Sequence, residues 1–139
     1  MNFEPTTTSA IEYSKKSKLE EWIHLFLCGD EKDGGNEAFS RGLKLEPRKY
    51  YSPCLMDLNT FERCCGPEEG MKFKIPVLDF NKNVNGIMEK YKNSSWDMPP
   101  LIVNRIAEKY ELNDGNHRFE ALKRLGTKEF WVIIWETEW

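Results

Sequence analysis

Apolar residues recur with a helical period in the first third of the chain, starting just after Ser17. They stand at positions i, i+3, i+4, i+7 and i+8, namely Leu19, Trp22, Ile23, Phe26 and Leu27. This spacing puts them on one face and predicts an amphipathic helix. Ser17 with Glu20 three residues later matches a capping box, and Gly29 follows the last apolar position, so the start and stop signals agree with the period.

The segments around this helix have weaker patterns. Residues 1–16 are polar and show no period, which predicts a loose lead-in. A turn over residues 30–35 leads into a short helix over 37–43. Prolines and glycines punctuate residues 46–70, which indicates a connecting loop with one short helix over 58–63.

The second half of the chain alternates between strand and helix patterns. In chain order these predict a strand over 72–80, a helix over 84–91, strands over 101–103 and 109–113 that pair as a hairpin, a helix that begins after Gly115 and stops at Gly126, and a strand over 130–135. The mixture predicts a small α/β (α+β) domain over 71–139, a mixed sheet with packed helices. Residues 1–70 are then a helical extension packed on that domain.

Composition and charge narrow the class of protein. The chain has 139 residues, 40% of them hydrophobic, which suffices for one core. Residues 1–70 carry 9 basic and 13 acidic side chains and residues 71–139 carry 11 and 10, so neither half is strongly basic like a typical nucleic-acid binder. No apolar run is longer than a strand, which disfavours a membrane span or a secretion signal and favours the cytoplasm.

The four cysteines contain no Cys-x-x-Cys pair. Reduced cytosolic thiols are the simplest interpretation, and the neighbours Cys64 and Cys65 would join only in a strained eight-membered ring. A zinc site built from Cys54, Cys64 and Cys65 with His24 or His117 lacks the usual ligand spacing.

Five consecutive residues between a strand end and a helix start carry the clearest chemistry: Asp114, Gly115, Asn116, His117 and Arg118. At such a junction, unpaired N–H groups and the positive end of the helix dipole favour an anion. Gly115 allows a sharp turn and a close approach, and Arg118 offers a planar guanidinium for phosphate oxygens. His117 and Asp114 are the candidate catalytic groups, and Asp114 is also the candidate metal ligand.

A purely structural explanation of these residues stays open. In it, Asn116 or Asp114 caps the helix, and Arg118 forms an ordinary salt bridge with a nearby acid such as Glu120. The acidic pair Glu68-Glu69 is either a base or metal site close to the loop or an exposed charged turn. Among the aromatic residues, those in polar loops are the candidates for contact with a nucleobase: Tyr50, Tyr51 and Trp96.

The order of elements around this loop resembles the ParB/sulfiredoxin superfamily. The residues that carry the resemblance are PPLIV, YELNDGNHRFEALKRLG and WVIIW, and the match covers roughly residues 71–136. In that family a Gly-x-x-Arg loop, here Gly115 and Arg118, precedes a helix that ends in Leu-Gly, here Leu125-Gly126. The resemblance implies a small α/β fold whose loop binds nucleotide phosphates, through Gly115, Asn116, His117 and Arg118 in this chain.

The resemblance does not select one branch of that family. Sulfiredoxins place their catalytic cysteine where this chain has Asn116, and an amide cannot attack a sulfinic phosphoryl ester, which argues against peroxiredoxin repair. Partition-type ParB proteins carry a helix-turn-helix domain after the loop, whereas this sequence stops soon after the last predicted strand, so a centromere-binding role is not expected. Free serine kinases use an early acidic residue as base, for which Asp79, Glu68 and Glu69 are the candidates.

The favoured function is binding of a nucleotide phosphate at the Asp-Gly-Asn-His-Arg loop, with ATP, ADP or another nucleotide as ligand. If the chain is an enzyme, the expected reaction is phosphoryl transfer to a small-molecule or protein acceptor, or phosphoanhydride hydrolysis, with Mg²⁺ offsetting the phosphate charge. The alternatives are a DNA-binding ParB-like nuclease module and a nucleotide-gated interaction domain without turnover.

Overall fold

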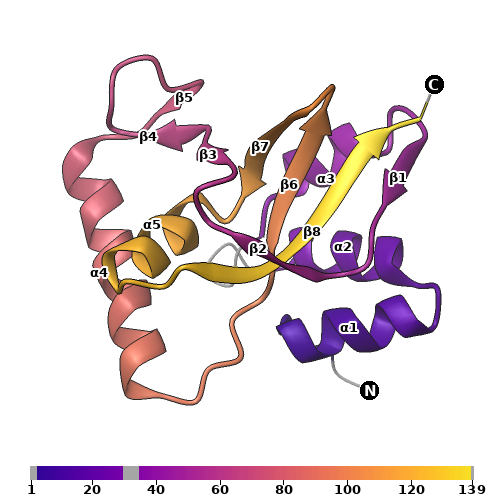
Figure 1. The fold of residues 1–139 in the computed structure, drawn as a ribbon, viewed down its shortest axis with the longest axis horizontal. Helices are drawn as coiled ribbons and strands as arrows, with labels where there is room; N and C mark the ends of the chain where they lie inside the picture. The colour runs from indigo at the N-terminus through magenta and orange to yellow at the C-terminus, as the bar shows by residue number, and fades with distance from the viewer. Residues whose placement is uncertain (1–2, 30–34, 139) are drawn as a thin grey trace.

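The computed structural model describes residues 3–29 and 35–138, drawn in colour in Figure 1. Within these ranges the helices are α1 (Thr7–Lys15), α2 (Leu19–Leu27), α3 (Glu37–Leu43), α4 (Val77–Asn93) and α5 (Asn116–Arg124). The strands are β1 (Arg48–Tyr50), β2 (Cys54–Asp57), β3 (Glu62–Arg63), β4 (Cys65–Gly66), β5 (Phe73–Lys74), β6 (Leu101–Ile106), β7 (Lys109–Asp114) and β8 (Glu129–Thr137). The turn predicted over residues 30–35 lies, except for Gly35, outside the described residues.

The main sheet is mixed and has the strand order β1-β8-β6-β7-β3. β6 runs parallel to β8 and antiparallel to β7, as the predicted hairpin requires. β1 and β2 pair with successive parts of β8, at Thr137 to Trp135 and at Val132 to Glu129. The predicted α/β class, a mixed sheet with packed helices, is therefore confirmed. Because β1, β2 and β3 belong to this sheet, the first half of the chain supplies strands as well as helices.

Helices cover both faces of the sheet, on opposite sides of it in Figure 1. Ile102 and Ile133 belong to the cluster formed by α1, α2 and α3. Their neighbours along the strands, Leu101, Val103 and Val132, belong to the cluster that includes α5. Because strands that are buried on both faces carry apolar residues at nearly every position, this alternation explains the nearly continuous apolar sequences of β6 and β8.

α4 forms an outer layer on α5. Phe80 and Val84, one helical turn apart, pack against Ala121 of α5. The strand predicted over residues 72–80 is wrong beyond the two residues of β5, because α4 begins at Val77. The alternation there is misleading, since the apolar Val77 and Leu78 are 54% and 81% exposed. The helix predicted over 84–91 is confirmed as part of α4.

The N-terminal lead-in is an ordered helix, contrary to the prediction. Thr6 and Ser9 form a capping box at the start of α1, and the Thr7 hydroxyl donates to the carbonyl of Met98 at 2.6 Å. The predicted Ser17–Glu20 capping box is also wrong, because α2 has Lys18 at its N-cap without a side-chain hydrogen bond. The apolar stripe of α2 is confirmed, and all its members are buried: Leu19, Trp22, Ile23, Phe26 and Leu27.

The short helix predicted over residues 58–63 is wrong. The segment instead forms a turn followed by β3, and β3 pairs in parallel with Glu111 and Leu112 of β7. Leu58 and Phe61 are buried in the cluster that contains α5. Contacts with distant strands, which leave no period in such a short segment, decide this conformation.

Candidate functional site

The turn between β7 and α5 is built on a glycine that no other residue replaces without strain. Gly115 has φ +99° and stands at the N-cap of α5. A Cβ at this position would lie 2.7 Å from Leu101 Cδ2 and 2.9 Å from Arg118 Nη2. The first helical hydrogen bond runs from Phe119 N to Gly115 O at 2.8 Å. The N–H groups of Asn116, His117 and Arg118 precede it, at the positive end of the helix dipole.

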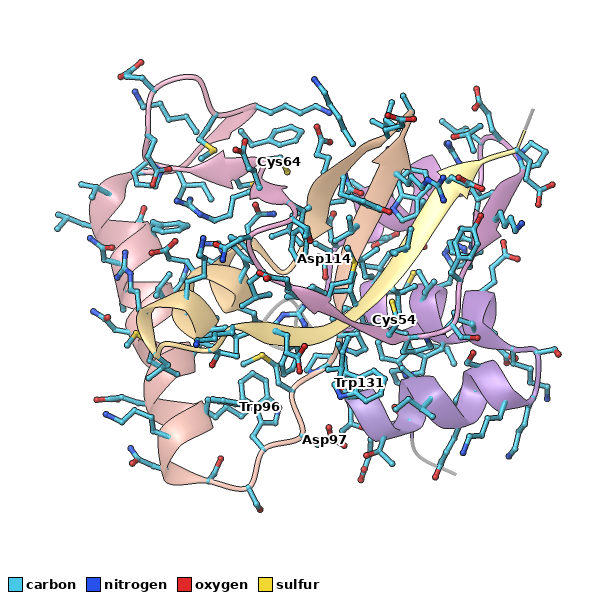
Figure 2. The ribbon with its side chains drawn as sticks, viewed as in Figure 1. Cys54, Cys64, Trp96, Asp97, Asp114 and Trp131 are labelled. Atoms are coloured by element: carbon cyan, nitrogen blue, oxygen red, sulfur yellow. The ribbon has the colours of Figure 1, made fainter. Side chains whose placement is uncertain are left out.

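Arg118 lies beneath this turn in a buried ion pair. Its Nη2 donates to Asp114 Oδ2 at 3.0 Å, and Nη1 donates to the carbonyls of Pro99 at 2.6 Å and Pro100 at 3.1 Å. Arg118 is 6% exposed and Asp114 8%. Figure 2 shows Asp114 in the middle of the molecule, where β7 meets α5. The guanidinium thus ties the turn to the segment that leads into β6.

Burial shapes the ionisation of both partners. It raises the pKa of Asp114 to about 6, although the positive charge of Arg118 and the hydrogen bond from it act in the opposite direction. Burial also lowers the pKa of Arg118, against the effect of Asp114. The structural alternative, a salt bridge of Arg118 with a nearby acid, is confirmed, but the acid is Asp114. The predicted example, Glu120, is wrong, because Glu120 pairs with Arg124 at 2.9 Å and with Arg63 at 3.4 Å.

The side chain of Asn116 bonds to a distant part of the chain, a contact that was not predicted. Its Oδ1 accepts hydrogen bonds from the backbone N–H groups of Cys64 at 2.8 Å and Cys65 at 3.1 Å. The side chain is buried, so its carboxamide connects α5 with the segment between β3 and β4. No short-range signal predicts this contact, since the partners are separated by 52 and 51 residues.

His117 is half-buried, with its ring tilted against Phe80 at a centroid distance of 5.1 Å. Its Nε2 is buried and has no hydrogen-bond partner among the described residues. Burial, followed by the positive charges of Arg63 and Arg118, lowers the pKa of His117. The imidazole is therefore neutral at pH 7 and able to accept a proton or a hydrogen bond.

A cavity of about 670 Å³ opens in front of the turn. Residues 113–118 line one wall, and α4 contributes Lys82, Asn83 and Lys90. Trp96, shown beside α4 in Figure 2, also lines the cavity, and the Lys90 ammonium lies 4.0 Å from its ring centroid. Gly35 and Asn36, just before α3, complete the lining on another side. The turn, α4 and the segment before α3 therefore line one cavity.

The other candidate groups lie elsewhere. Glu68 pairs with Arg63 at 2.6 Å, which lowers its pKa, and Glu69 pairs with Lys74 at 2.6 Å. Neither these acids nor Asp79 is among the cavity-lining residues. Tyr51 donates to Glu136 at 2.5 Å. Of the aromatic candidates, Trp96 alone belongs to the described lining.

No group of three or more His, Cys, Asp and Glu side chains in residues 3–29 and 35–138 is arranged to hold a metal ion. The described geometry therefore gives no support to a zinc site at Cys54, Cys64 and Cys65, and metal binding by Asp114 stays a prediction. None of the described helices is long and apolar enough to cross a membrane.

No family model matches the chain, and no curated protein matches it. Several solved structures are similar to it. They include a conserved hypothetical protein from Pyrococcus furiosus (19% identity, 63% of this chain and 34% of that chain, TM-score 0.48) and a free serine kinase in complex with AMP (18%, 65% and 33%, 0.47). A sulfiredoxin from Arabidopsis thaliana is also similar (19%, 59% and 82%, 0.42).

The chain thus spans about a third of the length of the first two proteins. ParB structures are among the similar ones as well. The similar structures therefore include the three kinds of protein named in the sequence resemblance: a sulfiredoxin, a free serine kinase and ParB proteins.

Proposed function

We propose that this chain binds the phosphate groups of a nucleotide in the cavity between α4 and the N-terminus of α5. The observation that carries this proposal is that the positive end of one helix and the lysines of another line the same cavity. The first turn of α5 presents backbone N–H groups there, and Lys82 and Lys90 line the cavity from α4. Among the described lining residues Asp114 is the one carboxylate, and Arg118 pairs with it, so the net charge of the lining favours an anion.

In this proposal, backbone N–H groups and lysines bind different parts of the nucleotide phosphates. The N–H groups of Asn116 and His117 hold one phosphate in fixed geometry, while the flexible lysines follow the remaining negative charges. Arg118 supports the turn from below, because its hydrogen bonds to Asp114, Pro99 and Pro100 already engage both terminal nitrogens. A direct contact between Arg118 and phosphate stays a prediction.

A nucleotide, rather than a smaller phosphate compound, is favoured by the sequence resemblance and by Trp96. This ring lines the same cavity and offers a surface on which a base can stack. Stacking of one base on an aromatic side chain contributes about 1–3 kcal/mol. The cavity volume of about 670 Å³ is within the range of small-molecule and cofactor sites.

Phosphoryl transfer or phosphoanhydride hydrolysis is the catalytic form of this proposal. His117 is the better-supported base, because its Nε2 is unpartnered among the described residues and its lowered pKa leaves the ring neutral at pH 7. Asp114 is less suited to this role, because its Oδ2 accepts a hydrogen bond from Arg118 in the buried ion pair. The residues present do not fit a resident Mg²⁺, since the lining carboxylate is already paired, and any Mg²⁺ would arrive with the nucleotide.

Gly35 and Asn36 support the non-catalytic alternative. Because they line the cavity just before α3, a bound nucleotide would touch the N-terminal segment directly. Binding would then be transmitted to α3 without turnover. The two forms differ in one measurement, the release of inorganic phosphate or the labelling of an acceptor during incubation with the nucleotide that binds.

Calorimetric titration with ATP, ADP, CTP and GTP, with and without Mg²⁺, tests the proposal. Lys82→Gln and Lys90→Gln should each weaken binding about fivefold, the equivalent of about 1 kcal/mol for one charge pair near water. Lys92→Gln is the matched control, because Lys92 lies in the same helix and is exposed but does not line the cavity. Folded protein that binds none of the four nucleotides would contradict the proposal.

Arg118→Ala is a poor first variant. It leaves Asp114 buried without its partner, which in other proteins costs about 3–5 kcal/mol. A loss of binding in that variant would report unfolding as readily as a missing contact.

A further inference from the structure

We propose that Cys64 and Cys65 form a redox-active vicinal dithiol, which a hydroperoxide oxidises to a disulfide between the two neighbours. Their sulfur atoms lie 3.6 Å apart. Cys64 lies between β3 and β4, and Cys65 is the first residue of β4. This site shares no reaction with nucleotide binding, and the two proposals stand or fall separately.

The two cysteines line different cavities. Cys64 is buried and lines a cavity of about 360 Å³ together with Lys72, Lys109 and Glu111. Cys65 is half-buried and lines the larger cavity at the start of α5. Figure 2 labels Cys64 beside the start of β4, away from Cys54. Because both residues line cavities, a small hydroperoxide can reach the pair.

Cys64 is the nucleophile of the pair. Hydrogen bonding from the Cys65 thiol lowers the pKa of Cys64 against the opposing effect of burial, and the Asn116 amide, with Nδ2 at 3.7 Å from the sulfur, lowers it further. The same interaction and burial raise the pKa of Cys65, which keeps its proton. Elsewhere in the chain, burial raises the pKa of Cys54, so that thiol is less reactive.

The oxidation balances without any further reagent. The Cys64 thiolate attacks one oxygen of the hydroperoxide, the O–O bond breaks, and the leaving alkoxide takes a proton to become an alcohol, or water when the oxidant is hydrogen peroxide. Cys64 is then a sulfenic acid. The Cys65 sulfur attacks this sulfenic sulfur, the S–O bond breaks, and hydroxide leaves with the Cys65 proton as water. Two electrons pass from the two thiols to the peroxide.

Closing the disulfide changes the contact with α5. The sulfurs must approach from 3.6 Å to about 2.05 Å within an eight-membered ring, which twists the peptide that joins the two residues. The N–H groups of both residues donate to Asn116 Oδ1, so this twist moves at least one donor away from its acceptor. Oxidation of the dithiol therefore changes the hydrogen bonds that Asn116, the first residue of α5, accepts.

Peptide mapping of the full chain tests the proposal. In a chain carrying Cys28→Ser and Cys54→Ser, stoichiometric hydrogen peroxide followed by alkylation should yield a peptide that contains Cys64 and Cys65, lacks two hydrogens and carries no alkyl group. A further Cys65→Ser substitution should trap Cys64 as a sulfenic acid that dimedone labels. Cys64→Ser should leave Cys65 unlabelled at the same peroxide dose.

The unmodified chain supplies a second measurement that needs no substitution. Phenylarsine oxide condenses with two adjacent thiols and releases one water, so it should protect Cys64 and Cys65 together from alkylation. In the ¹H–¹⁵N spectrum, oxidation should shift the Asn116 side-chain amide. Free, fully alkylated Cys64 and Cys65 after peroxide treatment, or oxidation of Cys64 to the sulfinic acid without the linked peptide, would overturn the proposal.

Discussion

Replacement of Gly115 by alanine tests the tightest point of the β7–α5 turn. The new Cβ would lie 2.7 Å from Leu101 Cδ2 and 2.9 Å from Arg118 Nη2. Neither neighbour yields easily, because Leu101 is fully buried in the core and three hydrogen bonds fix Arg118. A positive φ for a non-glycine residue costs about 1–2 kcal/mol, and overpacking adds about 1–3 kcal/mol. We expect Gly115→Ala to lower the free energy of unfolding by about 2–5 kcal/mol.

Two other glycines separate these contributions. Gly126 has φ +81° with open space around it, so Gly126→Ala measures the backbone cost alone, about 1–2 kcal/mol. Gly86 lies inside α4, with open space and no positive φ, so Gly86→Ala should stabilise the protein by about 0.5–1 kcal/mol. Urea unfolding with equal m-values gives the three differences on one scale. If Gly115→Ala costs no more than Gly126→Ala, the close approach of Leu101 and Arg118 to the turn is wrong.

Two further predictions concern the residues that follow Gly115. Asn116→Ala removes the acceptor of the Cys64 and Cys65 N–H groups and should lower the free energy of unfolding by about 2–4 kcal/mol. Asn116→Asp keeps an acceptor oxygen and should lower it less. If urea unfolding shows equal losses for the two variants, the contact is not the cause. For His117, the folded pKa lies below the ordinary value of 6.5, so below pH 6.5 the unfolded chain binds more protons and stability falls as the pH falls. This acid-induced loss should be smaller in His117→Gln, and an NMR titration of the wild-type ring with its midpoint at or above 6.5 would contradict the assignment.

The sequence patterns succeeded where local and tertiary preferences agree. The five-residue stripe of α2 lies wholly in the core, and the hairpin, α5 and β8 occur where periodicity and glycine positions indicated. They failed in α1 and at the start of α4. α1 depends on Thr7 bonding to Met98, 91 residues away, and α4 depends on Phe80 and Val84 meeting α5. Such contacts leave no period in the sequence.

The same division holds for the site. The sequence alone determined that a strand, a sharp turn at a glycine and a helix follow one another at Asp114-Gly115-Asn116, because each of these preferences acts over a few residues. Only the tertiary structure decided what the side chains do there. Arg118 turns to Pro99 and Pro100, while Asn116 holds Cys64 and Cys65, because burial demands a partner for each polar group and the available partners come from distant parts of the chain.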